Sequence, residues 1–395
     1  MRVPHLPYLP SSHFGGDDTL LLQFFNESKS QILTPIINDS LAHFIMRVAL
    51  SDSSFTSNLV LEGILTIASL QLQGVSKSSA RQHRLISLLR ENIMQIDKEN
   101  VLRNLITTML LYQYEVCTTA SPKKCWSLYL CGAKKIIDAS SATVELYKDE
   151  SAVLMDWIYY HEVVSEFSIR HWAEADAVDS FCKGPLAIRP KGSSFDGSEI
   201  SSKNTCPTDV LDLLRVICKR PSTCDHDDLT YDKSDIAQMY ELKRRLEEAV
   251  GENGTFHDIA EVTSTRQGML AYLYRCATLI YLNRAVLKVS NASFHHRRLV
   301  REGILVLQNL GFCESAWPML ILACEANEDE QRLQILQTLS QSGQEPLHRS
   351  SHVPLIQRMI EAIWNQNDLG CDSDVDYSRT LHAVISTAPA LPLFA

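Results

Sequence analysis

The residues nearest to a known catalytic spacing lie at positions 161–165, which read His-Glu-Val-Val-Ser. A zinc-hydrolase helix needs two imidazoles one turn apart on the metal, with a glutamate between them as general base. His161 and Glu162 match the first two places, but Ser165 stands where the second imidazole is required. A hydroxyl cannot replace that ligand. The run therefore favours a polar pair on the edge of an otherwise buried helix.

A second group of metal-ligand residue types lies between positions 218 and 228. Its two cysteines are six residues apart, which matches no standard structural zinc spacing. The surrounding residues are typical of a loop, so an acidic, solvated loop is favoured over a metal site. The residues concerned are Cys218, Cys224, Asp225, His226, Asp227 and Asp228.

The aspartates of this region support one enzymatic alternative. Asp227, Asp228 and Asp232 resemble the aspartate-rich motif of all-α terpene cyclases, which holds magnesium and diphosphate. Magnesium would need carboxylates from two facing helices. The second metal motif of those enzymes is not found after this point, and Asn38-Asp39-Ser40 lies on the wrong side of it. A cyclase-like enzyme is the best alternative to a protein without catalytic activity.

Other catalytic motifs, such as a glycine-rich phosphate loop, a nucleophile elbow or the kinase motifs, are not recognisable. We therefore expect a protein that is not an enzyme, with no catalytic, cofactor-binding or metal-ligating residues and no cofactor. The 11 cysteines are irregularly spaced, and no two of them are separated by two residues. In a reducing compartment they are expected to be small buried hydrophobes.

Composition and charge are those of a globular protein with a substantial core. The chain has 395 residues, of which 45% are hydrophobic and 21% charged. Its formal net charge is −10, whereas a protein that binds nucleic acid by itself normally presents a concentrated basic face. The N-terminus lacks the apolar core of a signal peptide, and the apolar run 59–72 is too short to span a bilayer. We expect a nucleocytoplasmic protein with no membrane partner.

Two small basic clusters interrupt this acidic background. Lys243-Arg244-Arg245 lies among glutamates three and four residues away, which is typical of a solvated helix face, with a nuclear-import signal as the alternative. His295-His296-Arg297-Arg298, with Arg301, is expected to form the polar side of a helix. The inner side of that helix would carry Leu299, Ile304 and Leu307.

Nearly every strong segment has the three-to-four spacing of an amphipathic helix, and almost none alternates like a strand. The sequence predicts an all-α fold, a large irregular helical bundle or array with no significant β-sheet. The helix at 59–72 is apolar almost all round and should be central. The predicted helices are 59–72, 80–96, 101–116, 125–139, 152–172, 210–219, 236–250, 267–289, 294–310, 317–326, 330–339 and 353–364.

The domain organisation follows from composition. Residues 1–19 are expected to be a flexible N-terminal segment, and residues 20–395 one large domain. Residues 183–208 are rich in Gly, Pro and Ser and are expected to be a long or disordered loop, since similar helices resume after it. The aromatic stretches 157–172 and 272–281 could line an apolar ligand site, although filling the core is the favoured interpretation.

The most informative stretch runs from Ser315 to Arg332. Trp317-Pro318 opens an apolar helix, with proline in the first turn where it costs no backbone hydrogen bond, and Cys324-Glu325-Ala326 follows. This stretch resembles the signature near the C-terminal end of the fungal-specific transcription factor domain. That signature has tryptophan-proline, a small residue before a glutamate, and an arginine several residues on. Trp317 is accordingly expected to be buried.

Further patches in the same order extend the resemblance over residues 20–395. In the family pattern at 126–137, Gly132-Ala133 is expected to let two helices approach closely. The resemblance is carried by Ile32–Ile36, the 59–72 helix, Ala80–Leu89, Trp126–Ala133 with Ile136-Ile137, Trp364, Asp374 and Leu391–Phe394.

One departure from the family concerns DNA binding. Members usually carry a short N-terminal run of six cysteines that binds two zinc ions, with a basic segment attached. The first cysteine here is Cys117, already inside a predicted helix. Direct DNA binding is therefore not expected. Either the chain is a natural relative without the cluster, or its first exon is missing.

The resemblance implies a nuclear transcriptional regulator that controls a metabolic or secondary-metabolite gene set. The partners it implies are other transcription regulators or a second copy of the chain, with a small-molecule effector as a further possibility. Target genes and effector are not specified by these residues.

Overall fold

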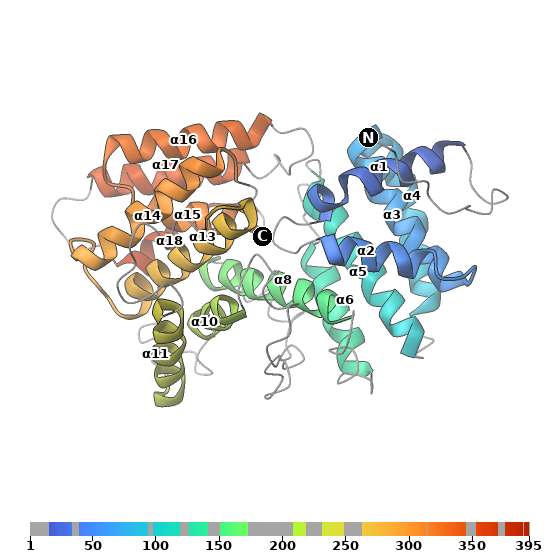
Figure 1. Cartoon of the computed structure of the whole chain (residues 1–395), viewed down its shortest axis with the longest axis horizontal. Helices are drawn as coiled ribbons and strands as arrows, with labels where there is room; N and C mark the ends of the chain where they lie inside the picture. The colour runs from blue at the N-terminus through green and yellow to red at the C-terminus, as the bar shows by residue number, and fades with distance from the viewer. Residues whose placement is uncertain are drawn as a thin grey trace.

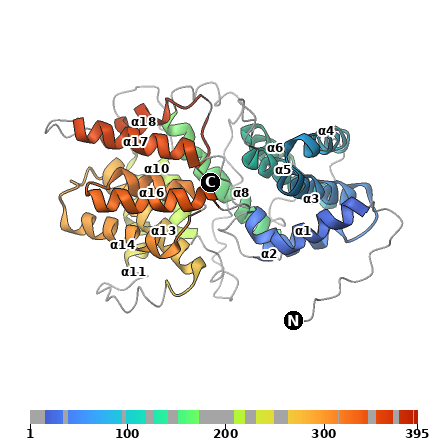
Figure 2. The same ribbon diagram turned by 90° about the horizontal axis from the view of Figure 1, so that it is seen from above.

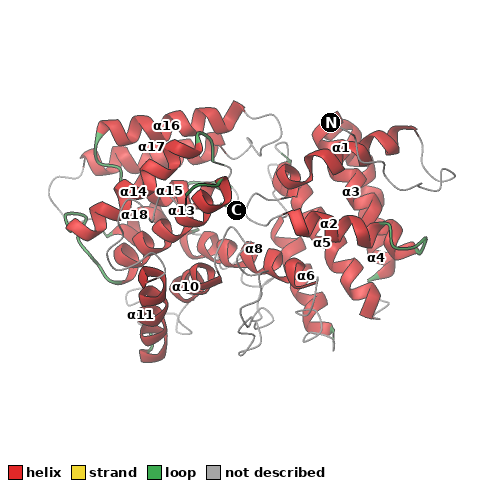
Figure 3. Ribbon diagram, viewed as in Figure 1, coloured by secondary structure: helices red, strands yellow, loops and turns green. Residues whose placement is uncertain are grey.

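The computed structural model shows an all-α protein, which confirms the predicted fold class (Figure 3). In the ranges it describes there are 15 α-helices and one short π-helix, and no strand. Those ranges are 16–33, 39–93, 98–118, 126–140, 151–172, 208–218, 231–248, 263–313, 315–344, 353–369, 376–389 and 391–394.

The helices form two halves with one long helix, α8 (Ala152–His171), lying between them (Figure 1). The view from above shows the same separation (Figure 2). Helix α8 contacts α2 and α6 in the N-terminal half and α10 and α18 in the C-terminal half. The line along which the halves meet α8 is called the seam below.

The N-terminal half is organised around α3, which packs against α1, α2, α4 and α5. Gly63 of α3 faces α5 so closely that a Cβ there would lie 2.8 Å from Leu110 Cδ1. At Gly132 a Cβ would lie 3.7 Å from Thr108 Cγ2, an ordinary contact, so the packing of α6 on α5 does not require a glycine at this position. The helices are α1 (Gly16–Leu33), α2 (Asp39–Ala49), α3 (Phe55–Gln73), α4 (Val75–Asn92), α5 (Lys98–Cys117) and α6 (Trp126–Ala139).

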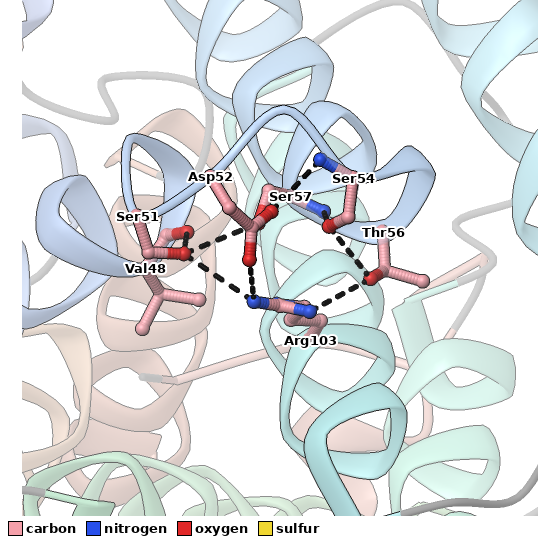
Figure 4. A network of polar contacts seen from close by, with 7 residues as sticks. All are labelled: Val48, Ser51, Asp52, Ser54, Thr56, Ser57 and Arg103. Carbon is pink, nitrogen blue, oxygen red and sulfur yellow. Dashed lines mark hydrogen bonds and ion pairs between the residues drawn. The ribbon is translucent and has the colours of Figure 1, made fainter.

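A polar network fixes the turn between α2 and α3 (Figure 4). Arg103 of α5 donates to Asp52 Oδ2 at 2.6 Å and to Thr56 Oγ1 at 3.1 Å. The Ser54 hydroxyl caps α3 by accepting from the Ser57 amide at 3.2 Å. Hydrogen bonds from Ser54 and Ser57, followed by the Arg103 charge, hold the pKa of Asp52 well below its ordinary value.

The C-terminal half is built around α15, whose residues from Trp317 to Cys324 are all buried. Gly303 of α14 allows this enclosure, because a Cβ there would lie 2.6 Å from Leu322 Cδ2. The helices are α10 (Thr208–Cys218), α11 (Lys233–Glu248), α13 (Arg266–Tyr281) continued by the π-helix η3 (Leu282–Val286), α14 (Phe294–Leu310), α15 (Ala316–Cys324), α16 (Asp329–Gln344), α17 (Val353–Leu369) and α18 (Tyr377–Ile385).

Several predicted boundaries agree closely with the structure, and three helices had not been predicted. The predicted helix 294–310 has the observed bounds of α14, and 267–289 corresponds to α13 with η3. Helices α1, α2 and α18 were missed. Because α1 begins at Gly16, the last four residues of the 1–19 segment are helical. The predicted loop 183–208 lies outside the described residues, apart from Thr208 at the start of α10.

Helix α3 is longer than the apolar run from which it was predicted. By length and composition alone its 19 residues could cross a membrane. Inside the fold, 72% of its apolar window is buried by other helices. This burial is what a core helix requires, so α3 is part of the core of the N-terminal half.

Candidate functional site

The seam is the candidate functional site, because α8 is joined there by buried polar contacts to both halves. Each contact pairs a side chain of α8 with a tyrosine hydroxyl from α5 in one half or from α13 in the other. The pairs are Tyr112–His161 at 3.0 Å, Tyr160–Tyr274 at 2.8 Å and His171–Tyr281 at 2.8 Å. All six side chains are buried. A change in the position of either half must therefore break or rearrange contacts to α8.

Aromatic rings fill the C-terminal side of the seam by packing on one another. Trp317 stacks on Tyr274, with ring centroids 5.8 Å apart and an interplanar angle of 23°. Phe167 of α8 meets the Trp317 ring edge-on at 6.0 Å and Phe394 at 5.5 Å. The prediction that Trp317 is buried is confirmed, since its exposed fraction is 0%. Of these rings, Phe167 and Tyr274 belong to the stretches 157–172 and 272–281, in which an apolar ligand site was considered, and their packing is that of a core.

A charged group lies on the side of α8 that faces α6 and α10. Lys134 of α6 forms an ion pair with the buried Glu162 at 2.9 Å. On α10, Asp212 accepts a hydrogen bond from the Tyr159 hydroxyl, and Arg215 lies over the Tyr159 ring. These contacts thus link α8 to α6 of the N-terminal half and to α10 of the C-terminal half. This group of polar contacts, with its one ion pair, is a second element of the seam.

The structure corrects the expected position of His161 and Glu162. Both are buried, with exposed fractions of 0% and 2%, and do not lie on a helix edge. The Ser165 hydroxyl donates to the backbone oxygen of Glu162 at 2.7 Å. His161 packs against Tyr112 and Glu162 pairs with Lys134, so the run connects helices through its polar side chains.

Burial and like charge perturb the carboxyl groups of this helix. Burial raises the pKa of Glu162, and the Lys134 charge opposes that rise. One turn further along α8, burial and then the Glu162 charge raise the pKa of Glu166 to about 7. Arg215 and Lys134 moderate this shift. The seam therefore contains a carboxyl group that titrates near neutral pH.

Residues of the 315–332 stretch and of α17 make side-chain contacts around the end of α15. The Trp364 indole donates to the Ala323 oxygen at 2.8 Å, and Arg332 Nε donates to the Ala326 oxygen at 3.1 Å. Arg332 also makes a bidentate pair with Asp368, at 2.8 and 2.7 Å. These side chains thus bind backbone oxygens in the last turn of α15 and just after its end.

Glu325 holds together three other elements of the C-terminal half. Its carboxylate accepts from Arg284 Nε of η3 at 3.1 Å and lies 3.0 Å from His296 Nε2 of α14. Arg284 in turn lies over the Tyr377 ring of α18. Because His296 is fully buried, the predicted polar face 295–298 is wrong at this one position. Sequence spacing could not show this contact, since 29 residues separate the two partners.

The other predicted basic cluster is a solvated helix face in the structure. Arg244 pairs with Glu241 at 2.7 Å and with Glu248 at 2.6 Å. Arg245 instead reaches Asp209 of α10 at 2.8 Å. Each of these arginines is thus paired with carboxylates of the same chain, so the basic cluster is neutralised locally.

The suggested metal sites are only partly within the described residues. Cys218 is buried in α10, and burial raises its pKa to about 12. Asp232 accepts a hydrogen bond from the Asp235 amide at 2.7 Å and so caps α11. In the described part of the chain, no three His, Cys, Asp or Glu side chains are grouped as a metal site would need. Cys224, Asp225, His226, Asp227 and Asp228 lie outside it.

A feature that sequence analysis missed is the position of residues 391–394 (Leu-Pro-Leu-Phe), called the 391–394 segment below. All four residues are buried in the seam. The Trp126 indole donates to the Leu391 oxygen at 3.2 Å, and the Trp317 amide donates to the Phe394 oxygen at 2.9 Å. The apolar sequence was a signal of burial, but the partners lie far away in the chain.

Comparison with known proteins gives two matches over most of the chain. The model of the family described as "Fungal specific transcription factor domain" matches residues 20–383. "Transcription factor iacI" of Pestalotiopsis fici is 25% identical over 387 residues, which cover 95% of this chain and 95% of that protein. No solved structure matches. The family match covers most of both halves and all of α8, and it ends before the 391–394 segment.

Proposed function

Because this chain belongs to the fungal-specific transcription factor domain family, we propose that it controls transcription of a metabolic or secondary-metabolite gene set. That it is a transcriptional regulator is supported by the family and by its relative. The observation that carries the proposal is the family match across 20–383, which includes every helix from α2 to α17. Nuclear localisation is part of the proposal.

The regulatory domain acts, in this proposal, through the seam. A protein with two arrangements of its halves responds to a partner or ligand that binds one arrangement more tightly. Moving such an equilibrium from 1:99 to 99:1 needs about 5.5 kcal/mol of differential binding. Three hydroxyl contacts and one buried ion pair at the seam support this mechanism, because they tie α8 to both halves. Other transcription regulators, a second copy of the chain or an apolar small molecule are the proposed partners.

The direct test is transcript profiling of a fungal strain in which the gene is deleted. A regulator predicts the coordinated change of a gene set, restored by the wild-type gene. As a control for loss of folding, the exposed Phe294→Ala variant should restore the same transcripts. Unchanged transcripts in the deletion strain would overturn the proposal.

The enzymatic alternative is tested by the double variant Asp227→Ala/Asp228→Ala. Aspartates that hold a catalytic magnesium are indispensable, whereas substitutions in a solvated loop usually change stability by less than about 0.5 kcal/mol. We expect the double variant to restore near-normal transcripts in the deletion strain. Loss of a metabolite with unchanged transcripts would instead support a cyclase-like enzyme.

A further inference from the structure

The 391–394 segment occupies the seam in the way that a peptide occupies a receptor groove. It has no helical or strand structure, yet Leu391, Leu393 and Phe394 are part of the continuous core. Phe394 has an exposed fraction of 0% and packs against Phe167 of α8. The segment is therefore held by side-chain burial in surfaces supplied by other elements.

Its backbone is bound from both halves of the molecule. Trp126 of α6, in the N-terminal half, donates to the Leu391 oxygen at 3.2 Å. Trp317 of α15, in the C-terminal half, donates its amide to the Phe394 oxygen at 2.9 Å. Just before the segment, the Trp172 indole at the end of α8 donates to the Ala388 oxygen at 3.3 Å. Trp126 and Trp172 thus donate indole N–H groups, and Trp317 donates its backbone amide, to backbone oxygens. Any extended peptide would offer such oxygens.

The contact at Trp317 gives the segment a specific role. Trp317 lies in the first turn of α15, where a backbone amide has no intrahelical acceptor. The Phe394 oxygen supplies that acceptor. If the segment left, the Trp317 amide would lose this partner while the hydrogen bonds within α15 stayed intact.

Such a segment can leave without unfolding the helices. Pro392 has no amide to donate and already restricts the backbone, which suits an extended bound peptide. The free energy gained by burying three apolar side chains is offset by the cost of ordering the chain. Local opening of a short segment can cost less free energy than unfolding of the whole protein.

We propose that the seam contains a groove for short, extended, apolar peptides and that the 391–394 segment is its intramolecular ligand. The groove donates hydrogen bonds to two backbone oxygens and buries leucine and phenylalanine side chains, as in other modes of extended-peptide recognition. While bound, the segment joins α6 to α15 and holds the halves in one arrangement. Only the regulatory consequence of its release rests on the proposed function.

The test is hydrogen exchange of the full chain, read at the Trp317 amide. Phe394→Ala empties the main side-chain site of the segment, and Phe294→Ala is its matched control, because Phe294 is 81% exposed. In Phe394→Ala we expect exchange at Trp317 to increase at least tenfold while exchange in α3 is unchanged. Phe294→Ala should change neither. An equal increase throughout the protein would show that the segment is ordinary core and would overturn the proposal.

A second measurement remains valid if Phe394→Ala folds poorly. Trp126→Phe removes the indole donor to Leu391 and keeps an aromatic ring in its place. A synthetic peptide of residues 386–395 should bind the Phe394→Ala or Trp126→Phe protein, and restore protection at Trp317 in the variant that it binds. It should not bind the wild type, whose groove is occupied. The proposal would be overturned if the peptide bound neither variant, or if it bound the wild type as tightly as the variants. It would also be overturned if a control peptide, with Leu393 and Phe394 replaced by aspartate, bound the variants equally well.

Discussion

At the scale of single residues, Trp317 of the family signature is held both by its ring and by its backbone amide. Its ring is enclosed by Tyr274, Phe167 and Tyr281, and its amide binds the 391–394 segment. Among the described residues, its buried indole nitrogen has no hydrogen-bond partner. These contacts of Trp317 are thus made by the ring and by the backbone amide.

Trp317→Ala should lower the free energy of unfolding by about 3–5 kcal/mol, the usual range for emptying a large aromatic site. Trp317→Phe should cost less, because it retains an aromatic ring and removes a buried donor without a partner. Urea denaturation measures both. A loss below about 1 kcal/mol for Trp317→Ala would show that the surrounding rings do not depend on this side chain.

Glu166 should make stability depend on pH near neutrality. Its pKa is about 7 in the folded protein, raised by burial and by Glu162, and about 4.3 in an unfolded chain. A raised pKa means that the folded state binds the proton more tightly. Its contribution to stability is then complete below about pH 4.3 and is lost as pH rises toward 7.

The measurement is urea denaturation at several pH values between 5 and 8. Glu166→Gln should weaken the fall in stability over the interval from pH 5 to 7, because glutamine does not titrate. An unchanged pH profile would mean that the Glu166 carboxyl is solvated and ordinary. Lys134→Ala is the comparison, since it should destabilise by about 3–5 kcal/mol by leaving the Glu162 charge buried and unpaired.

At the scale of helices, two glycines with different surroundings provide a matched pair. Gly303→Ala would place a Cβ 2.6 Å from the buried Leu322 side chain, whereas Gly132→Ala would place one 3.7 Å from Thr108. Overpacking costs about 1–3 kcal/mol, and alanine gains up to about 1 kcal/mol over glycine in a helix. Gly132→Ala should thus be neutral or stabilising and Gly303→Ala destabilising, as thermal denaturation would show. Equal effects would mean that α14 can move away from α15.

The sequence predicted most of the long helices, but an apolar stripe alone did not decide which helices were found. Helix α14 has such a stripe and was predicted with its observed bounds. Helix α1 was missed because its apolar residues follow no single stripe, whereas α2 and α18 have a stripe and were missed all the same. The pairing of Lys134 with Glu162 and of His296 with Glu325 could not be predicted, since spacing within a helix says nothing about a partner on another helix.

At the scale of the whole molecule, buried polar contacts join α8 to both halves. The N-terminal half has its own centre at α3 and the C-terminal half has one at α15. Between them, α8 and the 391–394 segment make the joining contacts. The halves share one continuous core, so a shift of one half against the other would have to rearrange these joining contacts. In the proposed mechanism, a partner that binds across the seam would act on them.

The distribution of charge over the whole molecule bears on DNA binding. Affinity for nucleic acid comes mainly from a concentrated basic surface, and this chain has a net charge of −10. Of its two basic clusters, 243–245 is paired with Glu241, Glu248 and Asp209, and 295–298 has one histidine buried against Glu325. We expect the purified 395-residue chain to bind no stoichiometric zinc, and to show no sequence-specific binding to promoter DNA at moderate salt. Elemental analysis and fluorescence anisotropy measure these two properties. One equivalent of tightly held zinc, or specific DNA binding by the isolated chain, would mean that this chain contacts promoters without a partner.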